Sequence, residues 1–287
     1  MTSQHPNTKL DSGVFSLADF RSIWEPQQKT VADIKFCPPH TSPPNLILGL
    51  KAIDASSLRI GCDIDKVTKK TAEVAVQSWD QAELYNAGYS WMTLPEGDLD
   101  IQFGRFDTRE GNTPGKPQTT TSITFDRPYP DIPKVITWLE GGSVQVGTSQ
   151  QCRLFTCALD VTANGFTLQV DSWDDTQLLS GVAGWVAFSA NRKDIRAGTF
   201  RIDDIRKWNE PRQQNSSYVP FGGKGFPKAP KVFTALFALD LDNATKRRLR
   251  LNLSVTDVSL NGMNWHLDTW EDSIVYTAGG VYIAYSQ

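Results

Sequence analysis

The stretch from Arg250 to Tyr285 reads RLNLSVTDVSLNGMNWHLDTWEDSIVYTAGGVYIAY, and its pattern organises the whole chain. Within it, Arg250, Trp270 and Tyr276 are separated by 20 and 6 residues. The same spacing occurs twice upstream, once with a leucine at the last position: Arg59, Trp79 and Tyr85, and Arg153, Trp173 and Leu179. Recurrence of this kind indicates tandem copies of one structural unit.

The segments that precede these patterns are also related. Residues 13–36 align without a gap with residues 198–221. The matched positions are Gly13 and Gly198, Phe15 and Phe200, Asp19 and Asp204, Arg21 and Arg206, Glu25 and Glu210, and Phe36 and Phe221. A weaker copy begins at Gly97, continues through Leu99 and Arg105, and ends at Phe125. We therefore divide the chain into three repeats, residues 1–94, 95–192 and 193–287.

Each repeat reads as about six short strands with almost no helical periodicity. Apolar runs at 46–53, 135–139 and 232–239 are followed by the strand that carries the arginine. Asn164-Gly165 and Asn261-Gly262 then predict hairpins, while Lys70-Thr71 occupies that position in the first repeat and requires another turn. The aromatic residues of the last strands are expected to pack in cores or at interfaces: Trp91, Trp185 and Tyr282. Short strands at regular spacing indicate an all-β protein of three small antiparallel sandwiches.

Composition excludes several classes of function. The chain has 287 residues, of which 39% are hydrophobic and 21% charged, as in an ordinary globular protein. The net charge is −3 and the only basic run is Lys246-Arg247-Arg248, so nucleic acid is not expected as the main partner. No apolar run reaches the length of a membrane span, and residues 1–10 lack the apolar region of a secretory signal. We expect a soluble, cytoplasmic protein, with unconventional export as the alternative.

The cysteines and histidines do not form a metal-binding pattern. The three histidines, His5, His40 and His266, are scattered, and the four cysteines contain no CxxC pair. Cys152 and Cys157 are five residues apart on one expected strand, so they face opposite sides and should not bridge. A bridge between Cys37 and Cys62 remains open, although free thiols are the simpler interpretation. We expect no metal and no cofactor.

The repeated Arg, Trp and Tyr suit the recognition of a neutral sugar. Each tryptophan lies at an expected strand end and is followed by acidic residues: Asp80, Asp174-Asp175 and Glu271-Asp272. A guanidinium donates to hydroxyl groups, a carboxylate accepts from them, and an aromatic ring covers the apolar face of a sugar. The structural alternative is that each arginine stacks on a tryptophan across strands and an acidic neighbour balances its charge.

The third repeat resembles the H-type lectin domain, the fold of snail agglutinins and of the C-terminal part of discoidins. The match runs through Pro230, Val232, Leu239-Asp240, Arg250, Val255-Thr256, Gly262, Trp270, Tyr276 and Ile283-Ala284-Tyr285. The second repeat matches through Pro133, Val135, Arg153, Val161-Thr162, Gly165 and Trp173, and the first keeps Asp54, Arg59, Trp79 and Tyr85. The resemblance implies six-stranded antiparallel β-sandwiches that bind galactose-type sugars, often N-acetylgalactosamine, without calcium.

The resemblance also implies site residues. In the first repeat they are Arg59, Trp79, Asp80 and Tyr85, and in the third Arg250, Trp270, Glu271 and Tyr276. An acid from the segment before the first core strand would be Glu25 or Glu210. The acid that follows each tryptophan replaces the histidine of some family members, which could change the preferred sugar. Because Leu179 replaces the tyrosine, the second site, around Arg153 and Trp173, is predicted to be weaker or lost.

Single-domain family members assemble as trimers, so three repeats on one chain imply a covalent pseudo-trimer that could associate further. The expected partners are glycans with terminal galactose-type sugars. One alternative is a scaffold whose sugar sites have decayed. A glycosidase would need paired carboxylates facing each other across a substrate. The only obvious pairs, Asp174-Asp175, Asp203-Asp204 and Glu271-Asp272, are sequence neighbours, so we expect a protein that is not an enzyme.

Overall fold

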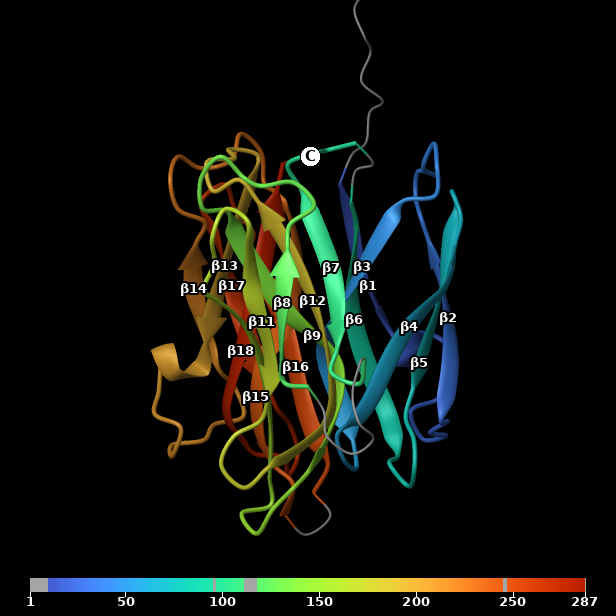
Figure 1. Ribbon diagram of the computed structural model, residues 1–287. Helices are drawn as coiled ribbons and strands as arrows, with labels where there is room; N and C mark the ends of the chain where they lie inside the picture. Colours follow the sequence, from blue (N-terminus) through green and yellow to red (C-terminus); the bar gives the residue numbers. More distant parts are fainter. Residues whose placement is uncertain (1–9, 95–96, 111–117, 245–246, 287) are drawn as a thin grey trace, which may run out of the picture.

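The computed structural model describes residues 10–94, 97–110, 118–244 and 247–286. In these ranges the regular structure is almost entirely β-strand (Figure 1), with short 3-10 turns η1 (Leu17–Asp19) and η2 (Ile202–Asp204). The all-β expectation is therefore confirmed. No helix in the described part of the chain is long and apolar enough to cross a membrane.

Each repeat contributes six strands in the same order. The first repeat supplies β1 (Asp11–Ser16), β2 (Lys29–Lys35), β3 (Asn45–Ala55), β4 (Arg59–Val67), β5 (Thr71–Gln77) and β6 (Leu84–Leu94). The second supplies β7 (Gln102–Asp107), β8 (Thr120–Thr124), β9 (Lys134–Gln145), β10 (Gln151–Leu159), β11 (Gly165–Asp171) and β12 (Gln177–Phe188). The third supplies β13 (Ile195–Arg201), β14 (Ser216–Pro220), β15 (Lys231–Asp242), β16 (Leu249–Thr256), β17 (Gly262–Asp268) and β18 (Val275–Tyr285).

The strands form three six-stranded antiparallel sheets, and every sheet combines strands of two repeats. The strand orders are β1-β6-β3-β16-β17-β14, β13-β18-β15-β10-β11-β8 and β2-β5-β4-β9-β12-β7. The repeats are thus joined at three strand pairs, β3 with β16, β15 with β10, and β9 with β4. We call these strand pairs joins. They close a ring in which each repeat is hydrogen-bonded to both others.

Within each repeat, apolar side chains pack between its two three-stranded halves, and these side chains belong to one cluster that runs through all three repeats. A phenylalanine that follows the second strand packs against an aromatic residue of the last strand, as with Phe36 and Trp91, whose ring centroids are 5.6 Å apart. The equivalent pairs are Phe125 with Trp185 and Phe221 with Tyr282. The three last-strand aromatics are buried, which confirms their expected core role.

A glycine opposite each of these aromatics fixes the register of the first strand. Gly13 pairs with Trp91, Gly104 with Trp185, and Gly198 with Tyr282. A Cβ atom at Gly13 would lie 2.7 Å from the Trp91 ring, so the close approach requires glycine. The weaker copy in the second repeat is therefore aligned on Gly104, and the sequence alignment on Gly97 is wrong.

The centre of the molecule is a second core shared by all three repeats. Trp138 on β9 is fully buried, packs against Phe233 on β15 at 5.3 Å, and donates its indole N–H to the carbonyl of Leu48 on β3. Because this core is built from side chains of all three repeats, its apolar surface is buried only when the repeats are together.

The predicted hairpins are confirmed, but their turns differ from the expected two-residue type. Residues 160–164 connect β10 to β11 and residues 257–261 connect β16 to β17. The left-handed positions are Asp160 and Asp257, with φ of 51° at both, rather than the Asn-Gly pairs. The first repeat turns through residues 68–70, where the Thr68 amide donates to the Thr71 carbonyl. All four cysteines are free thiols, Cys62 and Cys152 being buried.

Candidate functional site

The repeated arginines lie at the joins between repeats, where each faces a residue of another repeat. Across the joins, Arg250 on β16 pairs with Asp54 on β3, and Arg153 on β10 pairs with Asp240 on β15. At the third join, Arg59 on β4 pairs with Ser143 on β9. Each candidate site is therefore built by two repeats.

At the join of the third and first repeats, Arg250 is surrounded by carboxylates. Its guanidinium lies 2.7 Å from Glu271, 2.8 Å from Asp272 and 3.6 Å from Asp54. The Arg250 side chain is only 5% exposed, whereas that of Glu271 is 66% exposed. Burial raises the pKa of Asp54, an effect that the nearby Arg250 opposes. The arginine thus holds two solvent-facing acids in fixed positions.

The first repeat adds two aromatic residues to this join. In the pairing of β6 with β3, Asn86 lies opposite Asp54 and Leu84 lies opposite Ala55. Tyr85, between Asn86 and Leu84, therefore forms a bulge in β6. The Arg248 guanidinium is 3.4 Å from the centre of the Tyr85 ring and 6.0 Å from that of Trp24, which is 72% exposed. A pocket of ≈ 350 Å³ is lined by Trp24, Arg248, Arg250, Glu271 and Asp272.

The join of the second and third repeats has the same composition. Arg153 lies 3.2 Å from Asp174, 3.0 Å from Asp175 and 3.4 Å from Asp240. Hydrogen bonds from the amide and hydroxyl of Ser149 lower the pKa of Asp175 to about 2, so this acid is ionised at neutral pH. Burial raises the pKa of Asp240 to about 6.

Aromatic residues again come from the neighbouring repeat. Tyr276 occupies the bulge of β18 next to Asp240, and its ring lies 6.4 Å from that of Trp208. Trp208 is 60% exposed, like its counterpart Trp24. The Arg153 join thus contains a tyrosine and an exposed tryptophan, as the Arg250 join does.

The third join, between the first and second repeats, is poorer. Arg59 lies 3.0 Å from Asp80, but Ser143 stands where the other joins have an aspartate. The bulge of β12 carries Leu179, which is exposed. A pocket of ≈ 540 Å³ is lined by Ser57, Arg59, Asp80, Gln81 and Ala82.

Two groupings inferred from the sequence are corrected by these positions. Tyr85 belongs with Arg250 and Tyr276 with Arg153, so neither lies with the arginine of its own repeat. Leu179 lies at the Arg59 join, and its assignment to the site of Arg153 is wrong. The arginine and tyrosine of one repeat point to different neighbours, which spacing along the chain cannot reveal.

The repeated tryptophans lie beside the arginines. Trp173 packs against Phe155 at 5.9 Å, and Trp79 would be 3.4 Å from a Cβ atom at Gly61. Phe155 and Gly61 are two residues beyond Arg153 and Arg59, so they share a face of the strand with them. Trp270 follows Thr269, whose hydroxyl donates to the Arg250 carbonyl. All three tryptophans are half-buried.

The two predicted glutamates are not brought to the arginines. Glu25 and Glu210 are exposed, and neither takes part in an ion pair in the described ranges. Glutamines three residues further on make the loop contacts instead, Gln28 to the Asp80 carbonyl and Gln213 to the Glu271 carbonyl.

The matched arginines of the N-terminal segments support the bulges. Arg21 donates to the carbonyls of Leu84 and Tyr85, and Arg206 donates to those of Val275 and Tyr276. The alignment of Arg21 with Arg206 in the sequence already indicated that these two arginines have the same role. Trp24 and Trp208 could not be assigned to the sites from the sequence, since they occupy different positions of the alignment.

No group of three or more His, Cys, Asp or Glu side chains that could hold a metal ion is found in the residues that the structure describes. At the joins, the carboxylates are directed at guanidinium groups.

Comparisons with known proteins agree with these repeats. A family model described as the H-type lectin domain matches residues 31–93, 120–188 and 216–285, which together make up more than half of the chain. No curated protein matches the chain. Two solved structures of discoidin II from Dictyostelium discoideum are similar to it at 12% identity and a TM-score of 0.28. The recombinant form covers 50% of this chain and 74% of its own, and the wild-type form 52% and 75%.

Proposed function

Because the chain belongs to the H-type lectin domain family, we propose that it is a non-catalytic, multivalent lectin for galactose-type sugars, including N-acetylgalactosamine, that works without calcium. The Arg250 and Arg153 joins are the two principal sites, and the Arg59 join is weak or inactive. The observation that carries this proposal is the same set of groups at two joins, namely a buried arginine, exposed acids, a tyrosine and an exposed tryptophan.

The chemistry of the Arg250 join supports a neutral sugar as the ligand. Glu271 and Asp272 are held by the guanidinium and expose carboxylate oxygens that accept hydrogen bonds from neighbouring hydroxyl groups. Trp24 offers an apolar ring to the C–H face of a pyranose. Both kinds of contact work without a metal ion.

The ring of joins supports a covalent pseudo-trimer as the binding unit. Two sites held on one rigid body bind a surface with many glycans more tightly than one site does, because the second contact is intramolecular. The natural partners proposed are glycans or glycoproteins that end in galactose-type sugars.

Catalysis is the weaker alternative. A glycosidase requires one carboxyl group to act as an acid and another as a base or nucleophile on opposite sides of the scissile bond. Glu271 and Asp272 instead bind the same guanidinium. A scaffold with decayed sugar sites is favoured at one place only, the Arg59 join, which has Ser143 and Leu179.

A glycan array probed with the full chain, with and without a calcium chelator, tests the proposal. Binding to terminal galactose or N-acetylgalactosamine is expected in both conditions. Glu271→Gln combined with Asp174→Asn should reduce the signal at least about tenfold, because each of these carboxylates is exposed and accepts hydroxyl donors. Signal confined to another sugar class, or dependent on calcium, would contradict the proposed specificity.

A further inference from the structure

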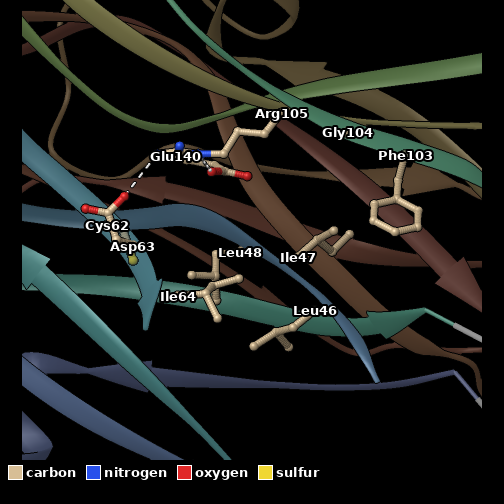
Figure 2. A pocket seen from close by; sticks show the side chains of 10 residues that line it. All are labelled: Leu46, Ile47, Leu48, Cys62, Asp63, Ile64, Phe103, Gly104, Arg105 and Glu140. Atoms are coloured by element: carbon tan, nitrogen blue, oxygen red, sulfur yellow. Dashed lines mark hydrogen bonds and ion pairs between the residues drawn. The ribbon is translucent and has the colours of Figure 1, made fainter. Parts of the chain in front are cut away.

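The join between β4 and β9 is shorter than the other two. It pairs only Arg59 with Ser143 and Ile60 with Gly142. By contrast, β16 pairs with β3 over residues 249–252, and β10 pairs with β15 over residues 151–155. Beyond Ile60, β4 therefore separates from β9. A pocket of ≈ 320 Å³ lies at this separation, lined by residues of β3, β4, β7 and β9 (Figure 2).

The pocket has an apolar wall and a charged end. The apolar wall consists of Leu46, Ile47, Leu48, Ile64 and Phe103. Phe103 and Ile64 are both more than one third exposed, so the pocket opens to solvent. The charged end is formed by Asp63, Arg105 and Glu140, as Figure 2 shows. A small apolar pocket with a few convergent polar groups is the usual form of a small-molecule site.

The charged end has two carboxylates and one guanidinium. Arg105 lies 2.9 Å from Glu140 Oε2 and 3.3 Å from Asp63 Oδ1, and Gln77 donates to Asp63 Oδ2 at 2.9 Å. The Glu140 side chain is only 9% exposed, and no donor within the described ranges reaches its Oε1. Buried carboxylates are normally fully paired. Glu140 Oε1 is therefore available to a donor that enters the pocket.

Neither of the other joins has this arrangement. The third strand of each repeat has an equivalent bulge. The bulged residue is Glu140 in β9, Lys51 in β3 and Phe237 in β15. The Phe237 ring fills the space above Gly279, and Arg201 stacks on it at 5.2 Å. Val14 and Thr199 stand where the second repeat has Arg105. Among the residues that the structure describes, the combination of Glu140 and Arg105 therefore occurs at this join alone.

We propose that this pocket, named here the β4–β9 groove, binds a small organic cation, a primary amine on an apolar body. The ammonium group donates to Glu140 Oε1 and Asp63, and its charge favours the ionised form of Glu140. The hydrocarbon part packs against Ile64 and Phe103. This site is separate from the sugar sites and does not depend on the proposed function.

Calorimetric titration of the full chain with 2-phenylethylamine at about pH 8, where an alkyl amine is protonated, tests the proposal. One saturable site per chain is expected. The neutral analogue 2-phenylethanol should bind at least about tenfold more weakly, because it lacks the charge. Glu140→Gln should weaken amine binding by a similar factor, and Phe103→Ala should weaken both ligands.

The matched control is Lys51→Gln, the equivalent bulge position of the first repeat, which should leave amine binding unchanged. Phe103→Ala keeps the test decisive if Glu140→Gln does not fold. Equal binding of the amine and the alcohol, unchanged amine binding in a folded Glu140→Gln, or no saturable binding would each overturn the proposal.

Discussion

At the scale of single residues, the joins use arginine as a support for acids. Arg250 and Arg153 are buried, and each meets three carboxylates from two repeats. The exposed atoms are therefore carboxylate oxygens and aromatic rings, whereas from the sequence we expect the guanidinium to contact a ligand as well. Arg21 and Arg206 act in the same supporting way beneath the tyrosines.

The buried carboxyl group of Glu140 should make stability depend on pH. Burial raises its pKa from 4.5 to about 7, so the folded state keeps a proton that the unfolded state loses. Stability should fall as pH rises through this window, with the full penalty above the folded pKa, at most about 3 kcal/mol. Urea unfolding at about pH 5 and about pH 8 measures the change. Glu140→Gln should give a flatter pH profile, and an equally steep profile would contradict the assignment.

At the scale of elements, the bulge of each repeat's last strand determines what its neighbour's arginine meets. The bulges of β6 and β18 carry Tyr85 and Tyr276, whereas that of β12 carries Leu179. Leu179 is accompanied by Ser143 at the position of Asp54 and Asp240. The difference between strong and weak joins is thus concentrated in two neighbouring strand positions.

Exchange of these bulge residues should change the number of sugar sites. Tyr85→Leu should remove one of two sites for N-acetylgalactosamine, because an aromatic surface and a hydroxyl are lost. Leu179→Tyr combined with Ser143→Asp should add binding at the Arg59 join. Calorimetric stoichiometry measures both changes. Tyr218→Leu, at an exposed tyrosine of the edge strand β14, is the control and should have no effect.

The β-strands could be predicted from the sequence, but the pairing of strands between repeats could not. Alternating patterns, turn residues and the aromatics of the last strands predicted the β-strands and cores, because these depend on local periodicity. The pairing of β3 with β16 depends on how whole repeats meet, and no feature within one repeat encodes it. The alignment on Gly97 missed that Gly104 and Phe106 repeat the spacing of Gly13 and Phe15, and the pairing of Gly104 with Trp185 confirms this match.

At the scale of the whole molecule, we expect the repeats to depend on one another for folding, because each shares a sheet with both of the others. Removal of residues 193–287 would leave β3 and β10 without β16 and β15, and Trp138 without Phe233. Two exposed strand edges and an open apolar core favour association. Residues 1–192 are therefore expected to aggregate or to fill the missing place with another copy.

Size-exclusion chromatography with light scattering measures this outcome, and circular dichroism reports whether strands persist. The full chain is the control, and adding residues 193–287 as a separate polypeptide should restore a soluble complex. A folded, soluble monomer of residues 1–192 would contradict the interdependence of the repeats.

The division of each site between two repeats also affects how the protein can evolve. In a ring of three identical subunits, one substitution changes all the sites at once. In this chain, a substitution in the first repeat affects only the site to which that residue belongs, since Arg59 and Tyr85 serve different joins. Ser143 and Leu179 could therefore arise at one join without cost to the others. The β4–β9 groove lies at that same join and is lined by other residues, so the two features can change independently.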